Sequence, residues 1–150
     1  MSVTREKEIM VAGMPTIGSV MTPLPRAVDV NTPLREVRKL MRERGIHHVP
    51  VRKSGELVAL LSDRDMKRAL DPALGLPGVD ELFAADVAVF EPVSVDEATL
   101  LDEALTKLVE LRIGSLLVER DGDLLGIFTA TDACRLFAEH LRAAMPPAVV

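Results

Sequence analysis

The chain has 150 residues, of which 48% are hydrophobic and 3% aromatic, and its formal net charge is −5. An acidic chain without Trp or Tyr lacks the basic face and the stacking aromatic side chains that are typical of nucleic-acid-binding proteins. The single cysteine, Cys134, excludes an intramolecular disulfide and a thiolate metal cluster. No apolar run reaches the roughly 18 residues of a membrane helix, and the charged start "MSVTREKEIM" is unlike a signal peptide. We therefore expect a cytoplasmic protein that binds neither membrane nor nucleic acid.

The first half of the chain predicts the order strand, helix, strand, strand, helix. Thr32 and Pro33 favour the N-cap and the first position of a helix, and apolar residues then recur at helical spacing as far as Met41. Two short apolar runs around a polar turn with a glycine predict a β-hairpin. The expected elements are a strand at 26–30, a helix after Thr32, strands at 46–51 and 57–61 around the turn 53–56, and a helix from Ser62.

The second half predicts the same order after a connector at 71–81 that contains two prolines and two glycines. The expected elements are a strand at 91–95, a helix from Leu101, strands at 113–118 and 124–128 around the turn 120–123, and a helix from Thr129. A shift of 67 positions aligns much of the two halves. The aligned pairs include Ile46 with Ile113, Gly55 with Gly122, Ser62 with Thr129, and Asp65 with Asp132.

This internal repeat predicts the fold. One copy, of roughly 60 residues, is marginal by itself, so two copies are expected to bury their sheets together. We predict an α+β fold with two β-α-β-β-α repeats related by a pseudo-two-fold axis, with the sheets packed together and the helices outside. The expected boundaries are an N-terminal flank at 1–14, repeats at 15–75 and 76–138, and a C-terminal tail at 139–150.

Two motifs at a constant offset identify a family. Copy two has Gly-h-h-Thr-x-x-Asp at 126–132, where h is an apolar residue, and copy one has the corresponding pattern at 59–65, with Ala59 where copy two has Gly126. Together with the β-α-β-β-α order, these motifs resemble a tandem CBS domain pair, or Bateman module, over about residues 15 to 138.

The resemblance implies clefts between the repeats that bind adenosine-containing ligands: AMP, ADP, ATP or S-adenosylmethionine. In this family the Asp of the motif takes the ribose hydroxyls, the Ser or Thr lies near ribose or phosphate, and the residue before the Asp touches phosphate. The strand before the hairpin lines the cleft that the other repeat's Asp completes. The implied residues are Asp65, Ser62 and Arg64 with Gly114 and Ser115 in one cleft, and Asp132, Thr129 and Thr131 with His47 and His48 in the other.

Simpler interpretations stand beside these. Each Ser/Thr-x-x-Asp motif also predicts a capping box, and one motif can serve both roles. Arg64 can be an ordinary solvated residue. A metal site at His47 and His48 is disfavoured because adjacent residues of a strand point to opposite faces. A hydrolase triad of Ser62, His48 and Asp65 is disfavoured because no Gly-x-Ser-x-Gly motif exists. We therefore expect no metal, no cofactor and no catalytic residue.

The leading functional prediction is a regulatory module that binds an adenine nucleotide and forms a homodimer. An unidentified effector protein is expected to respond to the change that the nucleotide causes. Arg64 offers a cation where copy two has Thr131, so we expect the Asp65 cleft to prefer more phosphate groups than the Asp132 cleft. The alternative is a structural or dimerisation module with vestigial pockets, which acts through protein-protein contacts.

Overall fold

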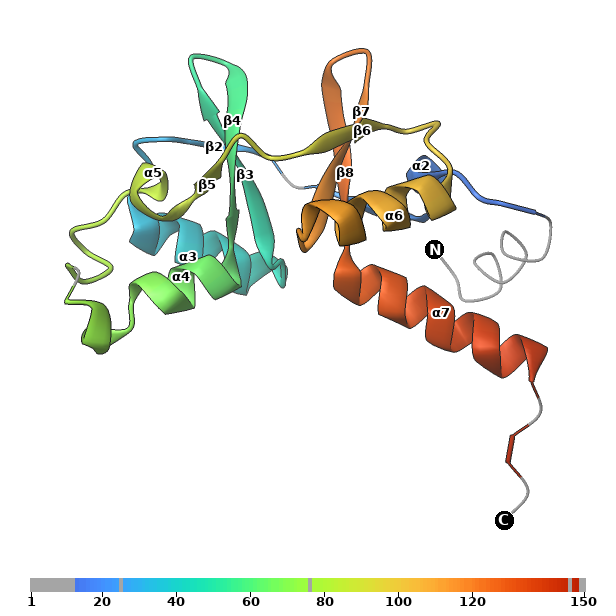
Figure 1. Cartoon of the computed structure of the whole chain (residues 1–150). Coiled ribbons are helices and arrows are strands. Elements are labelled where there is room, and N and C mark those ends of the chain that lie inside the picture. Colours follow the sequence, from blue (N-terminus) through green and yellow to red (C-terminus); the bar gives the residue numbers. More distant parts are fainter. Residues whose placement is uncertain (1–12, 25, 76, 146, 149–150) are drawn as a thin grey trace. The chain divides into compact units, whose positions relative to one another are not determined.

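The computed structural model describes residues 13–24, 26–75, 77–145 and 147–148, and it forms two compact units (Figure 1). One unit runs from Leu24 to Pro92, and the other joins the chain up to Pro23 to the chain from Val93 onward. The expected flank at 1–14 and tail at 139–150 therefore lie partly outside the described residues. The fold is α+β with two similar β-α-β-β-α repeats, as predicted.

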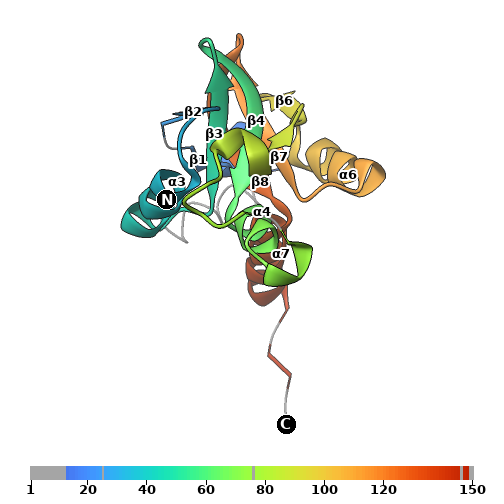
Figure 2. The ribbon, with the colours of Figure 1, turned by 90° about the vertical axis from the view of Figure 1, so that its left-hand side faces the viewer.

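The Leu24–Pro92 unit contains one four-stranded sheet in the order β2-β3-β4-β5. The β2 and β3 strands are parallel, and the other neighbours are antiparallel. In Figure 2 the turn of the β3–β4 hairpin is at the top, with α3 and α4 below it. The elements are β2 (Val28–Asp29), α3 (Leu34–Arg44), β3 (His48–Lys53), β4 (Glu56–Ser62), α4 (Asp63–Ala69), the 3₁₀ helix η1 (Pro72–Leu74), α5 (Ala84–Val87) and β5 (Val89–Phe90).

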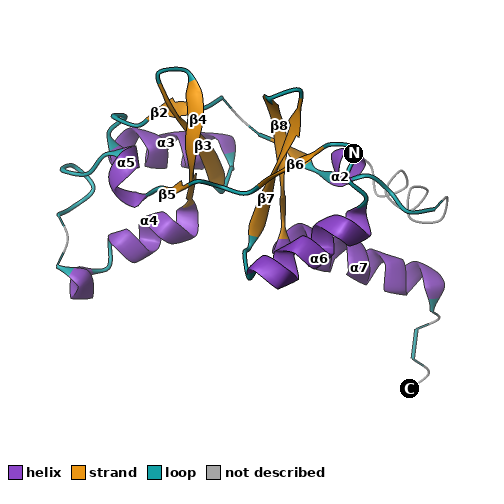
Figure 3. Cartoon of the chain, turned by 45° about the horizontal axis from the view of Figure 1, so that its top comes forward, coloured by secondary structure: helices purple, strands orange, loops and turns teal. Residues whose placement is uncertain are grey.

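The other unit repeats this plan with a sheet in the order β1-β8-β7-β6 (Figure 3). Its last helix, α7, is longer than α4 and continues beyond residue 138, where the second repeat was expected to end. The elements are α2 (Ile17–Val20), β1 (Thr22–Pro23), β6 (Ser94–Asp96), α6 (Leu101–Leu111), β7 (Ser115–Arg120), β8 (Asp123–Thr129) and α7 (Ala130–Ala144).

One of the two edge strands of each sheet comes from the segment that leads into the other repeat. The β1 strand precedes the first repeat but pairs with β8, with Thr22 opposite Ile127 and Pro23 opposite Gly126. The β5 strand precedes β6 in the sequence but pairs with β4. The α2 helix, which precedes β1, belongs to the same unit as β8, and there the Ile17 amide donates to the Thr99 carbonyl at 2.7 Å. The two units thus exchange short α-β segments.

The exchanged segments also explain where α3 and α6 begin. Thr32 is not the N-cap of α3, contrary to the sequence prediction: Pro33 occupies that position and makes no side-chain cap. Instead the Leu34 amide donates to the carbonyl of Leu82 at 2.8 Å, just before α5. The Leu101 amide of α6 likewise donates to the carbonyl of Pro15 at 2.8 Å. A main-chain carbonyl from the exchanged segment therefore satisfies a helix N-terminus that a side chain was expected to cap.

Each unit has its own apolar core between sheet and helices. Alternate residues of the β3–β4 hairpin, Val49 with Val51 and Ala59 with Leu61, belong to the core of the Leu24–Pro92 unit, because they share one face of the sheet. The exchanged helices contribute Ile17 and Ala84, both with 0% exposure. The larger buried residues are Leu34, Val37, Met41, Val49, Val51 and Leu61 in one core, and Ile17, Leu101, Leu116, Val118, Phe128 and Leu136 in the other. Among the described residues, no helix has the length and apolar character needed to cross a membrane.

Candidate functional site

The Ser62-x-x-Asp65 motif lies where β4 ends and α4 begins. Ser62 is the N-cap, and its Oγ accepts from the Asp65 amide at 3.0 Å. Oδ2 of Asp65 accepts in return from the Ser62 amide at 3.3 Å and from the Ser62 hydroxyl at 2.6 Å. The motif therefore forms the capping box that its spacing predicts.

The Thr129-x-x-Asp132 motif has the same geometry at the start of α7. The Thr129 Oγ1 accepts from the Asp132 amide at 3.2 Å, and Asp132 Oδ2 accepts from the Thr129 amide and hydroxyl, both at 2.9 Å. The Asp132 side chain is 17% exposed, and its Oδ1 lies 3.8 Å from Nη2 of Arg135. The second copy thus repeats the first in its hydrogen bonds as well as in its sequence.

Capping uses only half of each carboxylate. In both motifs the cap bonds converge on Oδ2. Within the described part of the chain, Oδ1 of Asp65 accepts no hydrogen bond, and Oδ1 of Asp132 has only the distant Arg135 guanidinium near it. An ionised carboxylate can accept about four hydrogen bonds. Each Asp therefore holds its helix start and still has an oxygen for a ligand hydroxyl.

The strand before each hairpin turn lies beside the capping box of its own unit. His48 pairs with Ser62, and Ser115 pairs with Thr129 in the antiparallel register. In addition, the Asp63 amide donates to the His47 carbonyl and the Ala130 amide donates to the Gly114 carbonyl, both at 2.9 Å. The structure thus brings together His47, His48, Ser62 and Asp65 in one unit, and Gly114, Ser115, Thr129 and Asp132 in the other. The approach of each strand to the other repeat's Asp concerns both units and stays a prediction.

Asp63 is a residue of this region that the sequence reasoning missed. Its Oδ2 lies 2.9 Å from Nδ1 of His47 and 3.9 Å from Nζ of Lys67. Partial burial raises the pKa of Asp63, but the hydrogen bond and charge of His47, the charge of Lys67 and the Arg64 amide together hold it below the ordinary value. The second copy has Gly114 and Ala130 at these positions, so the pair distinguishes the two sites.

The predicted phosphate contacts, Arg64 and Thr131, are exposed residues in the first turns of α4 and α7. Arg64 has no ion pair with any described residue, so its guanidinium is open to an anion. The described residues also contain no group of three or more His, Cys, Asp and Glu side chains that could hold a metal ion.

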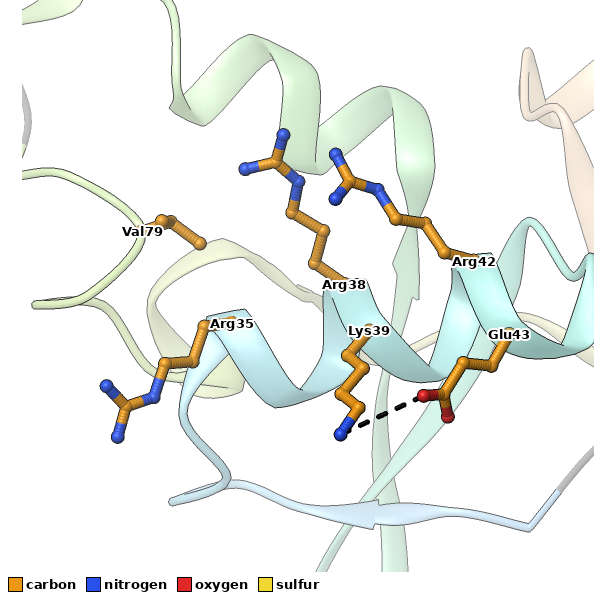
Figure 4. A pocket seen from close by; sticks show the side chains of 6 residues that line it. All are labelled: Arg35, Arg38, Lys39, Arg42, Glu43 and Val79. Atoms are coloured by element: carbon orange, nitrogen blue, oxygen red, sulfur yellow. Dashed lines mark ion pairs between the residues drawn. The ribbon is translucent and has the colours of Figure 1, made fainter.

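A pocket of about 310 Å³ lies on α3, and none of its lining residues is a predicted site residue (Figure 4). Its lining consists of Arg35, Arg38, Lys39, Arg42, Glu43 and Val79. The spacing of the four cations was readable from the sequence, because positions i, i+3, i+4 and i+7 share one face of a helix.

Comparison with known proteins adds a decisive observation. The CBS domain family model matches residues 17–72 and again residues 84–139, so the two matches begin at the first residues of α2 and α5. The chain belongs to the CBS domain family. The tandem CBS pair that the repeated motifs indicated is therefore confirmed.

Relatives with curated functions are much longer than this CBS pair. The chain is 30% identical over 130 residues to inosine-5'-monophosphate dehydrogenase of Thermoplasma acidophilum, an alignment that covers 85% of this chain and 25% of the dehydrogenase. The corresponding enzyme of Korarchaeum cryptofilum is 30% identical over 100 residues, 66% of this chain and 19% of the enzyme. The chain thus spans at most about a quarter of these relatives.

Solved structures match over most of the chain. An uncharacterized conserved protein from Pyrococcus horikoshii has a TM-score of 0.70 and 25% identity, with 91% of this chain and 97% of that chain covered. The structure of CBSX2 in complex with AMP has a TM-score of 0.69 and 26% identity, with 85% of this chain and 99% of that chain covered.

Proposed function

We propose that this CBS pair is a regulatory module that binds an adenosine-containing ligand, AMP, ADP or ATP, and has no catalytic activity of its own. The observation that carries the proposal is the same in both units: a half-buried Asp at a helix start that uses one oxygen for capping and keeps the other. The AMP complex of CBSX2, a related CBS protein at 26% identity, supports the class of ligand.

The chemistry of the two motifs suits a nucleoside. A carboxylate oxygen accepts hydrogen bonds from neighbouring ribose hydroxyls, and such charge-assisted bonds are stronger than neutral ones. At α7, a helix of 15 residues, the helix dipole also stabilises a phosphate near Thr131. At the shorter α4 the guanidinium of Arg64 supplies the positive charge instead. In this proposal the Asp65 site prefers ATP more strongly than the Asp132 site does.

The strands supply the rest of each proposed site. His47 and His48 would approach a ligand held by Asp132, and Gly114 and Ser115 one held by Asp65. S-adenosylmethionine shares the ribose and adenine of these nucleotides and is the alternative ligand. The proposal includes no metal and no other cofactor.

Regulation requires that the ligand bind one arrangement of the protein more tightly than another, since equal affinity shifts no equilibrium. We propose that a homodimer carries this change to an effector protein. Exposed apolar side chains on α6 and α7 support an association surface: Val109 is 77% exposed and Phe137 is 61% exposed. In the longer inosine-5'-monophosphate dehydrogenase relatives, the aligned region is a minor part of the chain.

Calorimetric titration with AMP and ATP tests the proposal. Asp65→Asn and Asp132→Asn should each weaken binding at one site at least tenfold, because a charged acceptor contributes about 1.5–3 kcal/mol to a hydrogen bond. Asp86→Asn is the matched control: Asp86 Oδ2 accepts from the Phe83 amide at 2.7 Å, a helix-start bond remote from either motif in sequence. Unchanged affinity in both site variants, or an equal loss in the control, would refute the proposal.

The capping boxes also favour a second candidate function, a structural or dimerisation module. In that case the Asp residues only hold the helix starts, and the protein acts through protein-protein contacts. Thermal unfolding separates the two functions. A ligand at 100 times its dissociation constant raises the free energy of unfolding by about 2.7 kcal/mol, whereas a module with vestigial pockets shows no shift with any adenine nucleotide or with S-adenosylmethionine.

A further inference from the structure

The pocket on α3 is a cluster of positive charge on one face of a helix. Arg35, Arg38, Lys39 and Arg42 occupy positions i, i+3, i+4 and i+7 and line a volume of about 310 Å³. The α3 segment contains five cations and two acids, a net charge of +3 in a chain whose total is −5. The α3 helix is thus positively charged in a chain whose net charge is negative.

Two of these cations have partners and two do not. Arg35 lies 3.8 Å from Asp80, and Lys39 lies 3.8 Å from Glu43, both as exposed ion pairs of little energetic weight. In the part of the chain that the structure describes, Arg38 and Arg42 form no ion pair and no side-chain hydrogen bond. Figure 4 shows their guanidinium groups directed to the same side of α3, while Arg35 and Lys39 extend away from them.

This arrangement has an electrostatic cost for the helix. Like charges four residues apart destabilise a helix, and Arg38 with Arg42 is such a pair, as is Arg35 with Lys39. An anion between Arg38 and Arg42 would remove the repulsion. Guanidinium groups bind phosphate oxygens in a bidentate manner, so two adjacent arginines match two phosphoryl groups.

The other repeat shows that the fold does not require these charges. The helix α6 is the counterpart of α3, and both helices have 11 residues. At the shift of 67 positions, Arg38 and Arg42 correspond to Leu105 and Val109. The cations are therefore an addition to one repeat.

We propose that the α3 pocket binds a compact polyphosphate anion of two or three phosphoryl groups. Five of the six lining residues are charged and only Val79 is an apolar residue, so cationic groups are the main feature that the pocket offers to a ligand. Its volume is at the lower end of the roughly 300–1,000 Å³ of small-molecule sites. None of its lining residues belongs to the motifs of Asp65 and Asp132, and the proposal does not depend on the nucleotide function proposed for them.

Calorimetric titration with inorganic tripolyphosphate at low salt tests the proposal. The double variant Arg38→Gln/Arg42→Gln should bind tripolyphosphate at least tenfold more weakly than the wild type does. The charge-matched control is Lys107→Gln/Arg142→Gln, which removes two exposed cations from the other unit and should leave the affinity within about twofold. Unchanged affinity in the α3 variant, or an equal loss in the control, would overturn the proposal.

Further measurements test whether the variant is folded and whether the pocket binds free polyphosphate or the phosphates of a nucleotide. The circular dichroism spectrum and the urea unfolding midpoint should be the same in the wild type and the α3 variant, which shows that the variant is folded. If ATP binding depends on the two arginines while tripolyphosphate does not bind the wild type, the pocket is not a polyphosphate site and the proposal is wrong. The single variants Arg38→Gln and Arg42→Gln should each lower the salt dependence of tripolyphosphate binding, and an unchanged salt dependence in both would contradict it.

Discussion

The Gly126→Ala variant tests whether the exchanged strand β1 (Thr22–Pro23) packs against β8 as the structure shows. A Cβ atom at Gly126 would lie 2.5 Å from the Thr22 carbonyl oxygen and 2.8 Å from Sδ of Met21, whereas ordinary contacts begin at 3.4 Å. The thioether of Met21 can rotate away, but the Thr22 carbonyl belongs to β1 and can move only with that strand. Overpacking of this kind costs about 1–3 kcal/mol. The melting temperature should therefore fall by about 3–10 °C.

The assays are thermal unfolding and urea unfolding, both followed by circular dichroism, with Gly78→Ala as the control. A Cβ atom at Gly78 meets nothing within 4 Å, so this substitution should change the free energy of unfolding by less than about 0.5 kcal/mol. Ala59 occupies the equivalent position in the other sheet, so alanine itself is compatible with the strand. If Gly126→Ala is as stable as the control, β1 does not pack against β8 and the exchange of segments is wrong.

Two other predictions concern the helix starts. Ser62→Ala and Thr129→Ala should each lower the free energy of unfolding by about 0.5–2 kcal/mol in urea titrations, because each removes a capping box; no loss in either variant would contradict the capping geometry. The pKa of Asp63 is lowered in the folded state, so its stabilising contribution is present above its ordinary value of 3.8 and is lost as the pH falls through the folded pKa. Asp63→Asn should therefore lose less stability than the wild type between pH 5 and about pH 2, and an identical decline would show that the His47 contact is not formed.

The parts of the fold that the sequence predicts are those decided by local patterns. The hairpins follow from short apolar runs around the turns that contain Gly55 and Gly122, both of which have a φ of +82°. The capping boxes follow from the spacing of Ser62 to Asp65 and of Thr129 to Asp132. Each of these features depends on a few neighbouring residues, so a local pattern is enough to predict it. Each pattern also occurs in both repeats, so the sequence predicts each feature twice.

The features that escaped prediction depend on residues distant in the sequence. The β1 strand has two residues and pairs with a strand about 100 positions later, which no local pattern indicates. The N-terminus of α3 is satisfied by the Leu82 carbonyl, so the Thr32-Pro33 pattern was misleading. The contact of Asp63 with His47 likewise joins a helix start to a neighbouring strand. The charged face of α3 was visible as a spacing, but only the structure shows which of its cations have partners.

The central claim is that the carboxylates of Asp65 and Asp132 hold the ribose hydroxyls of an adenine nucleotide. The most direct test is a thermodynamic cycle that compares AMP with its 2′,3′-dideoxy analogue. In the Asp65→Ala background, where one carboxylate remains, removal of the hydroxyls should weaken binding at least tenfold. After the further change Asp132→Ala, the two ligands should bind with affinities within about threefold of each other. A hydroxyl contribution that persists without either carboxylate, or that is absent while Asp132 is intact, would contradict the account.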